Sequence, residues 1–318
     1  MNFIRHIRAL GRLVRLPNLL IIAATQVLIR HCIIQPVLSQ GRFELQLPLG
    51  LFVLLVLATV FTAAGGYAIN DYFDRKMDQV NKPGSLIVGR LIYPRHAMAY
   101  HLFFSISGIV MGTWVAYRTG LLFLSLTSFM ATGLLWFYST TYKRELLLGN
   151  IIVALLTAMV PFLVLVFELP LLARAYGSDV TPLVKILFIW VSGFSVFAFL
   201  LNMIREIVKD AEDFEGDQAY GKNTVPVVWG MTIMKRLTAV LILLTIILLA
   251  CAWKFFIPQL IPLLYFLLFL IIPLGVVMLI VLKGDDRKAF HTASILLKLI
   301  MAAGLVFMVV ANFIIRSL

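Results

Sequence analysis

The chain has few charged residues, few acids and almost no cysteine, and each shortage removes a class of proteins. Asp, Glu, Lys and Arg together make up 13% of its 318 residues, about half the share found in soluble domains. Hydrophobic residues reach 62%, and the mean hydropathy is +1.00. The two cysteines, Cys32 and Cys251, lie within or beside apolar runs and predict neither a disulfide framework nor a metal site. The composition therefore indicates an integral membrane protein with helical spans.

Nine apolar runs are long enough to cross a hydrocarbon core of roughly 30 Å. We expect spans at about 18–38, 47–70, 97–117, 119–138, 147–168, 183–204, 237–256, 259–282 and 292–315. The predicted fold is an all-α membrane protein with nine transmembrane helices around a central cavity. Because the number of spans is odd, the termini should lie on opposite sides. Pro161 and Pro273 fall inside expected spans and predict kinks there.

The 27 Lys and Arg residues alternate between connecting segments, which is typical of a membrane protein and argues against a nucleic-acid partner. Most of them fall in the N-terminal segment and in 71–96, 139–149, 205–236 and 283–291. Because cytoplasmic loops are enriched in Lys and Arg, we expect a cytoplasmic N-terminus and an external C-terminus. The basic N-terminus precedes a long apolar run without a persuasive cleavage site, so we interpret that run as a retained first span.

One acidic spacing, D-x2-D-x3-D, occurs twice in a chain with only 15 acids. Its members are Asp71, Asp74 and Asp78 in the first set, and Asp210, Asp213 and Asp217 in the second. Positions i, i+3 and i+7 share one face of a helix, and carboxylates gathered there repel unless a cation lies between them. We expect each set to hold one Mg²⁺ and both ions to grip a diphosphate. The plainer alternative is a solvated helix end whose acids pair with neighbouring Lys and Arg.

The duplication suggests two related halves, about 1–145 and 146–318, within a single domain spanning 1–318. Both acidic sets belong to segments expected in the cytoplasm. We therefore expect a protein of the cell membrane or inner membrane whose active site faces the cytoplasm. No catalytic base is visible in the sequence, and the five histidines show no metal-ligand spacing.

Basic and aromatic residues suited to a diphosphate accompany the acidic sets. They are Lys82 and Arg90 after the first set, Lys209 and Lys222 around the second, and Tyr138, Tyr142, Lys143 and Arg144 between them. Arginine binds phosphate with two parallel hydrogen bonds, and lysine acts as a point charge. The two tyrosines, four residues apart, can offer ring faces to a cationic intermediate. Alternatively, the cations follow only from membrane topology and the tyrosines belong to an interfacial belt.

Polar amides near the cytoplasmic ends of spans are costly to leave unpaired, and we expect them to face the cavity. They are Asn18, Asn70, Asn150 and Asn202. Gly65 and Gly66 are better explained by close helix packing than by binding.

Taken in order, these motifs resemble those of the UbiA superfamily of intramembrane prenyltransferases. The string Asn70-Asp71-x-x-Asp74-x-x-x-Asp78 matches the family's N-D-x-x-D-x-x-x-D signature, and the second set matches its D-x-x-D region. Tyr138-x-x-x-Tyr142-Lys143 is similar to its Y-x-x-x-K element, and Arg15-Leu-Pro-Asn18 to its first-span motif. The resemblance covers essentially the whole chain.

Within the superfamily, the segment 205–226 is most similar to digeranylgeranylglyceryl phosphate synthases, although the chlorophyll synthase and homogentisate branches carry related E-G-D strings. The family's N-x-P-x-R-P segment is replaced here by Asn81-Lys-Pro83-Gly-Ser-Leu86. Lys82 or Arg90 would have to compensate for the missing arginine.

The resemblance implies transfer of a prenyl group from an allylic diphosphate, with geranylgeranyl diphosphate as the expected donor, to geranylgeranylglyceryl phosphate or another lipophilic acceptor. It implies two Mg²⁺ ions held by the six aspartates, and an enzyme in membrane lipid with no obligate protein partner. It assigns catalysis to Asp71, Asp74, Asp210, Asp213, Lys143 and Tyr138. From residue chemistry and the resemblance together, we expect substrate binding by Asn18, Asn70, Lys82, Arg90, Tyr142, Arg144, Asn150, Asn202, Lys209 and Lys222.

Two rival functions stay open on the sequence. The acceptor can be an aromatic quinone precursor or a tetrapyrrole instead of an ether lipid. The paired acids can also belong to a cation-coupled transporter, for which a motif repeated in two halves is typical.

Overall fold

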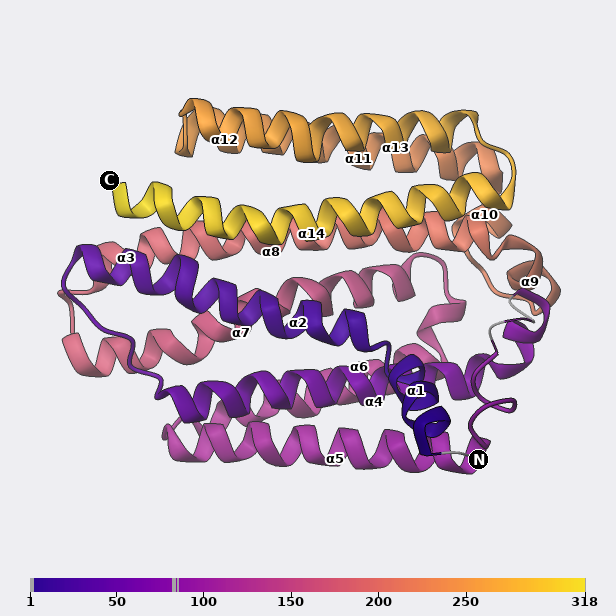
Figure 1. Cartoon of the computed structure of the whole chain (residues 1–318), viewed down its shortest axis with the longest axis horizontal. Helices are drawn as coiled ribbons and strands as arrows, with labels where there is room; N and C mark the ends of the chain where they lie inside the picture. The colour runs from indigo at the N-terminus through magenta and orange to yellow at the C-terminus, as the bar shows by residue number, and fades with distance from the viewer. Residues whose placement is uncertain (1–2, 82–83, 85, 318) are drawn as a thin grey trace. The chain divides into compact units, whose positions relative to one another are not determined.

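The computed structural model describes residues 3–81, 84 and 86–317 (Figure 1). Across those ranges the chain is helical, with an isolated β-bridge between Val88 and Ile92 as its extended element. Nine helices within the described residues are long and apolar enough to cross a membrane, as predicted. They are Leu16–Gln40, Leu49–Val80, Pro94–Arg118, Leu122–Thr140, Leu148–Tyr176, Thr181–Glu212, Gly230–Phe256, Leu260–Lys283 and Arg287–Ser317. The protein is an integral membrane protein.

The chain divides into two compact units. The first unit contains Met1–Lys143 and Met159–Val191, and the second contains Arg144–Ala158 and Ser192–Leu318. The first acidic set therefore belongs to the first unit, and the second acidic set to the second unit.

In the first unit, α4 (Leu49–Asn81) packs most extensively on α5 (Pro94–Arg118), and both contact α6 (Ser125–Thr140) (Figure 1). Small residues allow this approach, as expected for helices in a membrane. A Cβ on Gly65 would overlap the Ser105 side chain, and one on Gly66 would lie 2.8 Å from Leu135. Gly65 and Gly66 thus serve helix packing.

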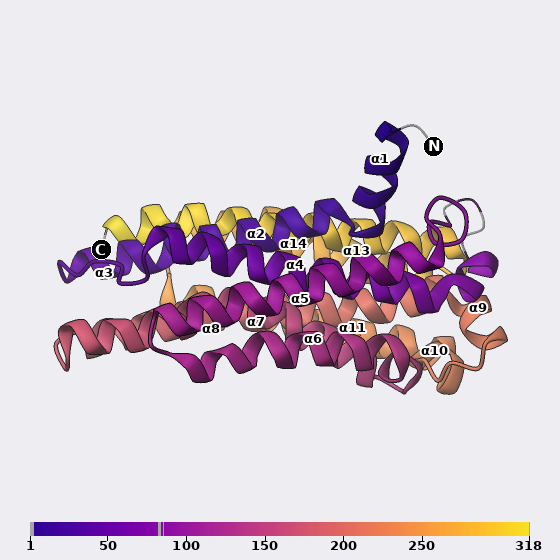
Figure 2. The same ribbon diagram turned by 90° about the horizontal axis from the view of Figure 1, so that it is seen from below.

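The N-terminal helix α1 (Phe3–Leu13) turns away from the line of α2 (Leu16–Leu28), as Figure 2 shows. Arg15, between them, adopts the left-handed conformation with φ 52° and ψ 56°. The inner face of α1 packs through Ala9 and Leu13 against Ala68 of α4. The opposite face of α1 is exposed and carries Arg8 and Arg12.

In the second unit, α13 (Ile272–Lys283) contacts both α11 (Gly230–Phe256) and α14 (Arg287–Ser317) (Figure 1). Phe307 of α14 is buried and packs against the rings of Tyr265 and Phe266. The short helices α9 (Phe214–Ala219), α10 (Val225–Val228) and α12 (Leu260–Tyr265) also belong to this unit. So do the parts of α7 (Leu148–Tyr176) and α8 (Thr181–Glu212) that carry Asn150 and Asp210.

Two spans contain a π-helical turn just before a proline. The turn Ile29–Ile34 precedes Pro36 in α3 (Gln35–Gln40), and the turn Phe266–Ile271 precedes Pro273 in α13. Proline lacks an amide hydrogen and crowds the preceding turn, and both proline and π-helical turns are recognised causes of helix kinks. By contrast, α7 (Leu148–Tyr176) continues as α-helix through Pro161 and Pro170.

The two helices that carry acids are longer than the apolar runs that predicted them. The predicted span 47–70 stops short of the first acidic set, whereas α4 continues to Asn81 and includes the whole set. The other helix, α8 (Thr181–Glu212), extends past the predicted end at 204 to include Asp210. Polar segments without glycine or proline can prolong a helix once the span has nucleated it.

At the start of α4, far along the helix from its acids, lies a buried polar cluster. Glu168 of α7 is fully buried and accepts hydrogen bonds from the backbone amides of Gln46 and Leu47. Arg30 donates to the Leu47 carbonyl at 2.6 Å, and its guanidinium stacks over the Phe52 ring. These bonds hold the segment before α4 in place.

Candidate active site

The first acidic set is held by two cations from elsewhere in the first unit. Arg15 Nη2 lies 3.2 Å from Asp71 Oδ1, and Lys143 Nζ lies 2.6 Å from Asp74 Oδ1. Lys143 is 9% exposed and also donates to Asn70 Oδ1 at 3.4 Å. The structure therefore brings four of the predicted residues together, namely Asn70, Asp71, Asp74 and Lys143.

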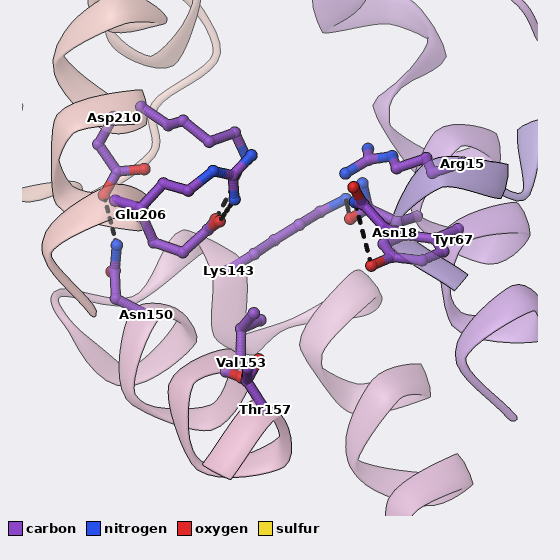
Figure 3. Close-up of polar contacts among 12 residues, drawn as sticks. Arg15, Asn18, Tyr67, Lys143, Asn150, Val153, Thr157, Glu206 and Asp210 are labelled. Carbon is purple, nitrogen blue, oxygen red and sulfur yellow. Dashed lines mark hydrogen bonds and ion pairs between the residues drawn. The ribbon is translucent and has the colours of Figure 1, made fainter. Parts of the chain in front are cut away.

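Arg15 and Tyr67 complete this group, although the sequence did not single them out as site residues. The Arg15 guanidinium carbon lies 4.9 Å from the centre of the Tyr67 ring. Asn18, a predicted binding residue, donates to the Tyr67 hydroxyl at 3.3 Å (Figure 3). Tyr67 precedes Asp71 by four residues, so the two share one face of α4. That spacing is the signal that could have identified it.

A pocket of about 550 Å³ opens beside the first set. Asp71 and Asp78 line it together with Arg12 and Arg15. The other described lining residues are Gly11, Pro17, Gly84, Leu86, Ile87 and Val88. The pocket thus combines two carboxylates seven residues apart with two guanidinium groups.

In the second unit, α8 presents Asp210 to an amide of α7. Asn150 Nδ2 donates to Asp210 Oδ2 at 2.8 Å (Figure 3). Asn150 was expected to face the cavity, and the structure places it against a carboxylate of the second acidic set. An amide donor stabilises the charged form of a buried carboxylate.

One turn before Asp210, Glu206 is buried and paired with two cations of its own helix. Arg205 Nη1 lies 2.7 Å from Glu206 Oε1, and Lys209 Nζ lies 3.2 Å from Glu206 Oε2. Arg205 was absent from the predicted site residues, because sequence spacing alone does not reveal which charges turn toward one carboxylate.

The second acidic set departs from the expected single helical face. Asp210 lies in α8, Asp213 follows the end of that helix, and Asp217 lies in α9. Asp213 has φ −97° and ψ 12°, and Asp is a poor residue for a helix interior. Asp217 is 1% exposed and pairs with Lys222 Nζ at 3.1 Å. Lys222 thus lies where the sequence placed it, beside this set.

The remaining predicted residues occupy varied positions. Tyr138 is half-buried on α6, and the Tyr142 ring centre lies 6.0 Å from that of Phe137. Arg144 is exposed. Arg90 is exposed too and donates to the Gly84 carbonyl at 3.4 Å. Lys82 lies outside the described residues.

Asn202 is 5% exposed on α8. Within the described part of the chain, its Nδ2 has no hydrogen-bond partner. A buried amide donor without a partner is costly, so this atom is available for a ligand or a water.

The aspartates fit a magnesium site that is completed by a ligand. Among the described residues, no three His, Cys, Asp or Glu side chains gather closely enough to hold a metal on their own. Mg²⁺ usually takes one or two carboxylates and fills its other positions with water and phosphate oxygens. Asp71 and Asp78, which line one pocket, supply oxygen donors of that kind.

Comparisons with known proteins agree with these motifs. Residues 40–312 match the model of the UbiA prenyltransferase family. Digeranylgeranylglyceryl phosphate synthase of Methanothermobacter thermautotrophicus is 32% identical over 272 residues, which cover 83% of this chain and 84% of that protein. The synthase of Korarchaeum cryptofilum is 32% identical over 268 residues, which cover 83% and 86%.

Solved structures share the fold. A structure of digeranylgeranylglyceryl phosphate synthase matches with a TM-score of 0.61 and 23% identity, covering 98% of this chain and 99% of that chain. A UbiA homolog from Archaeoglobus fulgidus, bound to DMAPP and Mg²⁺, matches with a TM-score of 0.52 and 18% identity, covering 97% and 99%. The family match spans most of the chain, and the chain therefore belongs to the UbiA prenyltransferase family of membrane enzymes.

Proposed function

We propose that this prenyltransferase moves a geranylgeranyl group from geranylgeranyl diphosphate to geranylgeranylglyceryl phosphate and releases diphosphate. The proposed acceptor is supported by sequence identity to digeranylgeranylglyceryl phosphate synthases over more than four fifths of the chain. Mg²⁺ is the proposed metal, because a homolog of the same fold was solved with Mg²⁺ and the prenyl diphosphate DMAPP.

In the first unit, Asp71, Asp74 and Asp78 are proposed to hold one Mg²⁺ on the donor diphosphate. Arg15 and Lys143 neutralise part of their charge and orient Asp71 and Asp74. When bound, the metal stabilises the negative charge that grows on the departing diphosphate. As the bond between the donor's first carbon and oxygen breaks, its electron pair leaves with the diphosphate.

In the second unit, Asp210, Asp213 and Asp217 are proposed to hold a second Mg²⁺. Asn150 orients Asp210, and Lys222 orients Asp217. Six further residues are proposed to contact the substrates. They are Lys209, Asn202, Tyr138, Tyr142, Arg144 and Arg90. The acceptor hydroxyl oxygen forms the new bond to carbon and loses its proton to water.

The proposed active site faces the cytoplasm. The support for this orientation is the distribution of Lys and Arg along the sequence, most of which lie in the segments on the same predicted side as both acidic sets. The phosphate-bearing ends of both substrates would meet the protein on that side, while their hydrocarbon tails stay in the bilayer.

The decisive test is product formation by the purified protein in lipid nanodiscs. We expect geranylgeranyl diphosphate, geranylgeranylglyceryl phosphate and Mg²⁺ to give a doubly alkylated glycerol phosphate, identified by mass spectrometry. Chelation with EDTA should stop the reaction, and added Mg²⁺ should restore it. Asp71→Ala and Asp210→Ala should each lower turnover by at least a hundredfold while the protein stays monodisperse.

Other outcomes would redirect the proposal. Prenylation of an aromatic or tetrapyrrole acceptor, with none of the ether lipid, would overturn the acceptor and keep the reaction type. Full activity of either aspartate variant would remove its set from the metal assignment. Activity that is indifferent to EDTA would contradict the metal itself.

A further inference from the structure

The pocket beside the first acidic set contains a cation that the predicted site does not use. Arg12, in the last turn of α1, lines it together with Asp71, Asp78 and Arg15. Arg15 is committed to Asp71 at 3.2 Å. Among the described residues, the Arg12 guanidinium is exposed and makes no hydrogen bond or ion pair. It is thus a free charge at the edge of an otherwise paired site.

The position of Arg12 depends on how α1 is fixed to the first unit. Ala9 and Leu13 of α1 pack into a buried cluster with Val88 and Ile92 from the segment that follows α4. His6 adds a contact at 2.6 Å to the hydroxyl of Tyr100 on α5. Because the opposite face of α1 is anchored by these residues, the Arg12 side chain starts from a fixed backbone position.

Two other arginines are less well placed for a ligand in this pocket. Arg8 lies one turn earlier on the exposed side of α1 and is not among the residues that line the pocket. Arg90, expected to replace the arginine missing after the first set, is exposed and bonded to the Gly84 carbonyl instead. Of these three arginines, Arg12 alone lines the pocket and has a guanidinium without a bond to another described residue.

We propose that Arg12 of α1 binds the diphosphate of the prenyl donor in this pocket, as a substrate-binding residue supplied by the N-terminal helix. The inference rests on the proposed function for the identity of the donor. A guanidinium can donate two parallel hydrogen bonds to phosphate oxygens. Those bonds would oppose the repulsion between the diphosphate and the carboxylates of Asp71 and Asp78.

The same chemistry would suit the phosphate of an anionic lipid headgroup, because Arg8 and Arg12 project from one exposed face. A lipid surface would attract both arginines in proportion to their exposure and charge. A diphosphate in the pocket would engage Arg12 and leave Arg8 untouched. Arg8 is therefore a matched control on the same helix, with the same charge.

The experiment measures equilibrium binding to the full-length protein in nanodiscs with Mg²⁺, with two probes. These are a non-transferable thiodiphosphate analogue of geranylgeranyl diphosphate and inorganic diphosphate. Arg12→Ala should weaken binding of both by roughly tenfold to a hundredfold, as expected for a hydrogen bond between charged groups. Arg12→Lys should recover part of the loss, and Arg8→Ala should stay within about twofold of the wild type.

Each remaining outcome decides the matter. Equal losses in Arg8→Ala and Arg12→Ala, seen only in anionic nanodiscs, would assign the arginines to a lipid surface and overturn the proposal. Unchanged binding in Arg12→Ala, or no binding by the wild type, would overturn it as well. Wild-type binding that depends on Arg12, without product formation, would support Arg12 as a diphosphate ligand while the proposed reaction fails. Thermal melting of all three variants reports whether they fold.

Discussion

The pair between Lys143 and Asp74 concentrates charge where little water reaches. Lys143 is 9% exposed, and its ammonium lies 2.6 Å from the Asp74 carboxylate. Removing one partner of a buried ion pair leaves the other charge uncompensated, which costs more than the pair itself contributes. The two residues should therefore be strongly coupled in stability as well as in activity.

Replacing Lys143 with Met should lower the free energy of unfolding by about 2–3 kcal/mol, because Asp74 loses its nearest cation. The measurement is the thermal unfolding midpoint in detergent without added metal. Asp74→Asn should cost less in the Lys143→Met background than in the wild type, giving a coupling energy of about 1–2 kcal/mol. Additive effects of the two changes would mean that the contact contributes nothing.

Arg15 combines a strained backbone with a functional side chain. Its φ of 52° lies in the left-handed region, which costs a non-glycine residue roughly 1–2 kcal/mol. Arg15→Gly should relieve that strain, whereas Arg15→Ala should keep it, so the glycine variant should unfold at the higher temperature. Both should lose activity to the same extent, because both lack the guanidinium beside Asp71. Activity retained by both variants would show that the guanidinium of Arg15 is not needed.

At the level of the helices, α4 and α5 approach closely because small residues lie at their contact. A side chain at Gly65 would meet Ser105 and the backbone around His101. A Cβ added to Gly133 of α6 would meet no atom of the described chain within 4 Å. A substitution at Gly65 therefore tests close helix packing, whereas one at Gly133 tests only the helix propensity of the new residue.

Gly65→Val should separate α4 from α5 and lower the unfolding midpoint by several degrees, since overpacking costs typically 1–3 kcal/mol. Gly133→Ala should be neutral or slightly stabilising, because alanine favours helix more than glycine does. The two variants can be compared by thermal unfolding and size-exclusion chromatography. If both behave alike, packing at Gly65 does not determine how α4 and α5 associate.

The helices show how far sequence patterns reach. Hydropathy predicted all nine spans, because twenty apolar residues in succession have few alternatives to a membrane helix. It missed the helical continuations of α4 and α8, where polar residues carry no hydropathy signal. The spacing of the second acidic set also implied one helical face, but the break at Asp213 depends on tertiary structure that spacing does not encode.

On the scale of the whole molecule, the odd number of spans predicts termini on opposite sides of the membrane. A green fluorescent protein fused before residue 1 should fluoresce in the cytoplasm. Alkaline phosphatase fused after Leu318 should be active only if the C-terminus is outside. Both fusions can be made in a bacterial host. The controls exchange the two reporters, with the phosphatase at the N-terminus and the fluorescent protein at the C-terminus. An active N-terminal phosphatase fusion would contradict the cytoplasmic orientation of both acidic sets.

The sequence predicted many of the residues of the candidate site, but not most of the contacts between them. Asp71, Asp74 and Lys143 were expected together because family motifs carry them. Lys143 contacts Asp74, and Asp71 contacts Arg15. Arg12 and Arg205 were missed, because their positions depend on a packed helix and on the direction of a side chain, which leave no spacing in the sequence. Arg15 was quoted as part of a motif but not as a site residue, and Tyr67 was missed although it precedes Asp71 by four residues.

The length of α4 bears on how substrates reach the enzyme. Its 33 residues extend about 50 Å, whereas the hydrocarbon core measures about 30 Å. The excess brings the acidic turns to the headgroup layer, level with the phosphates of lipids that already reside in the leaflet. A long-chain donor then arrives by lateral diffusion in two dimensions. Its effective concentration is a mole fraction in the bilayer, so diluting it with inert lipid slows turnover even when its amount per volume is constant.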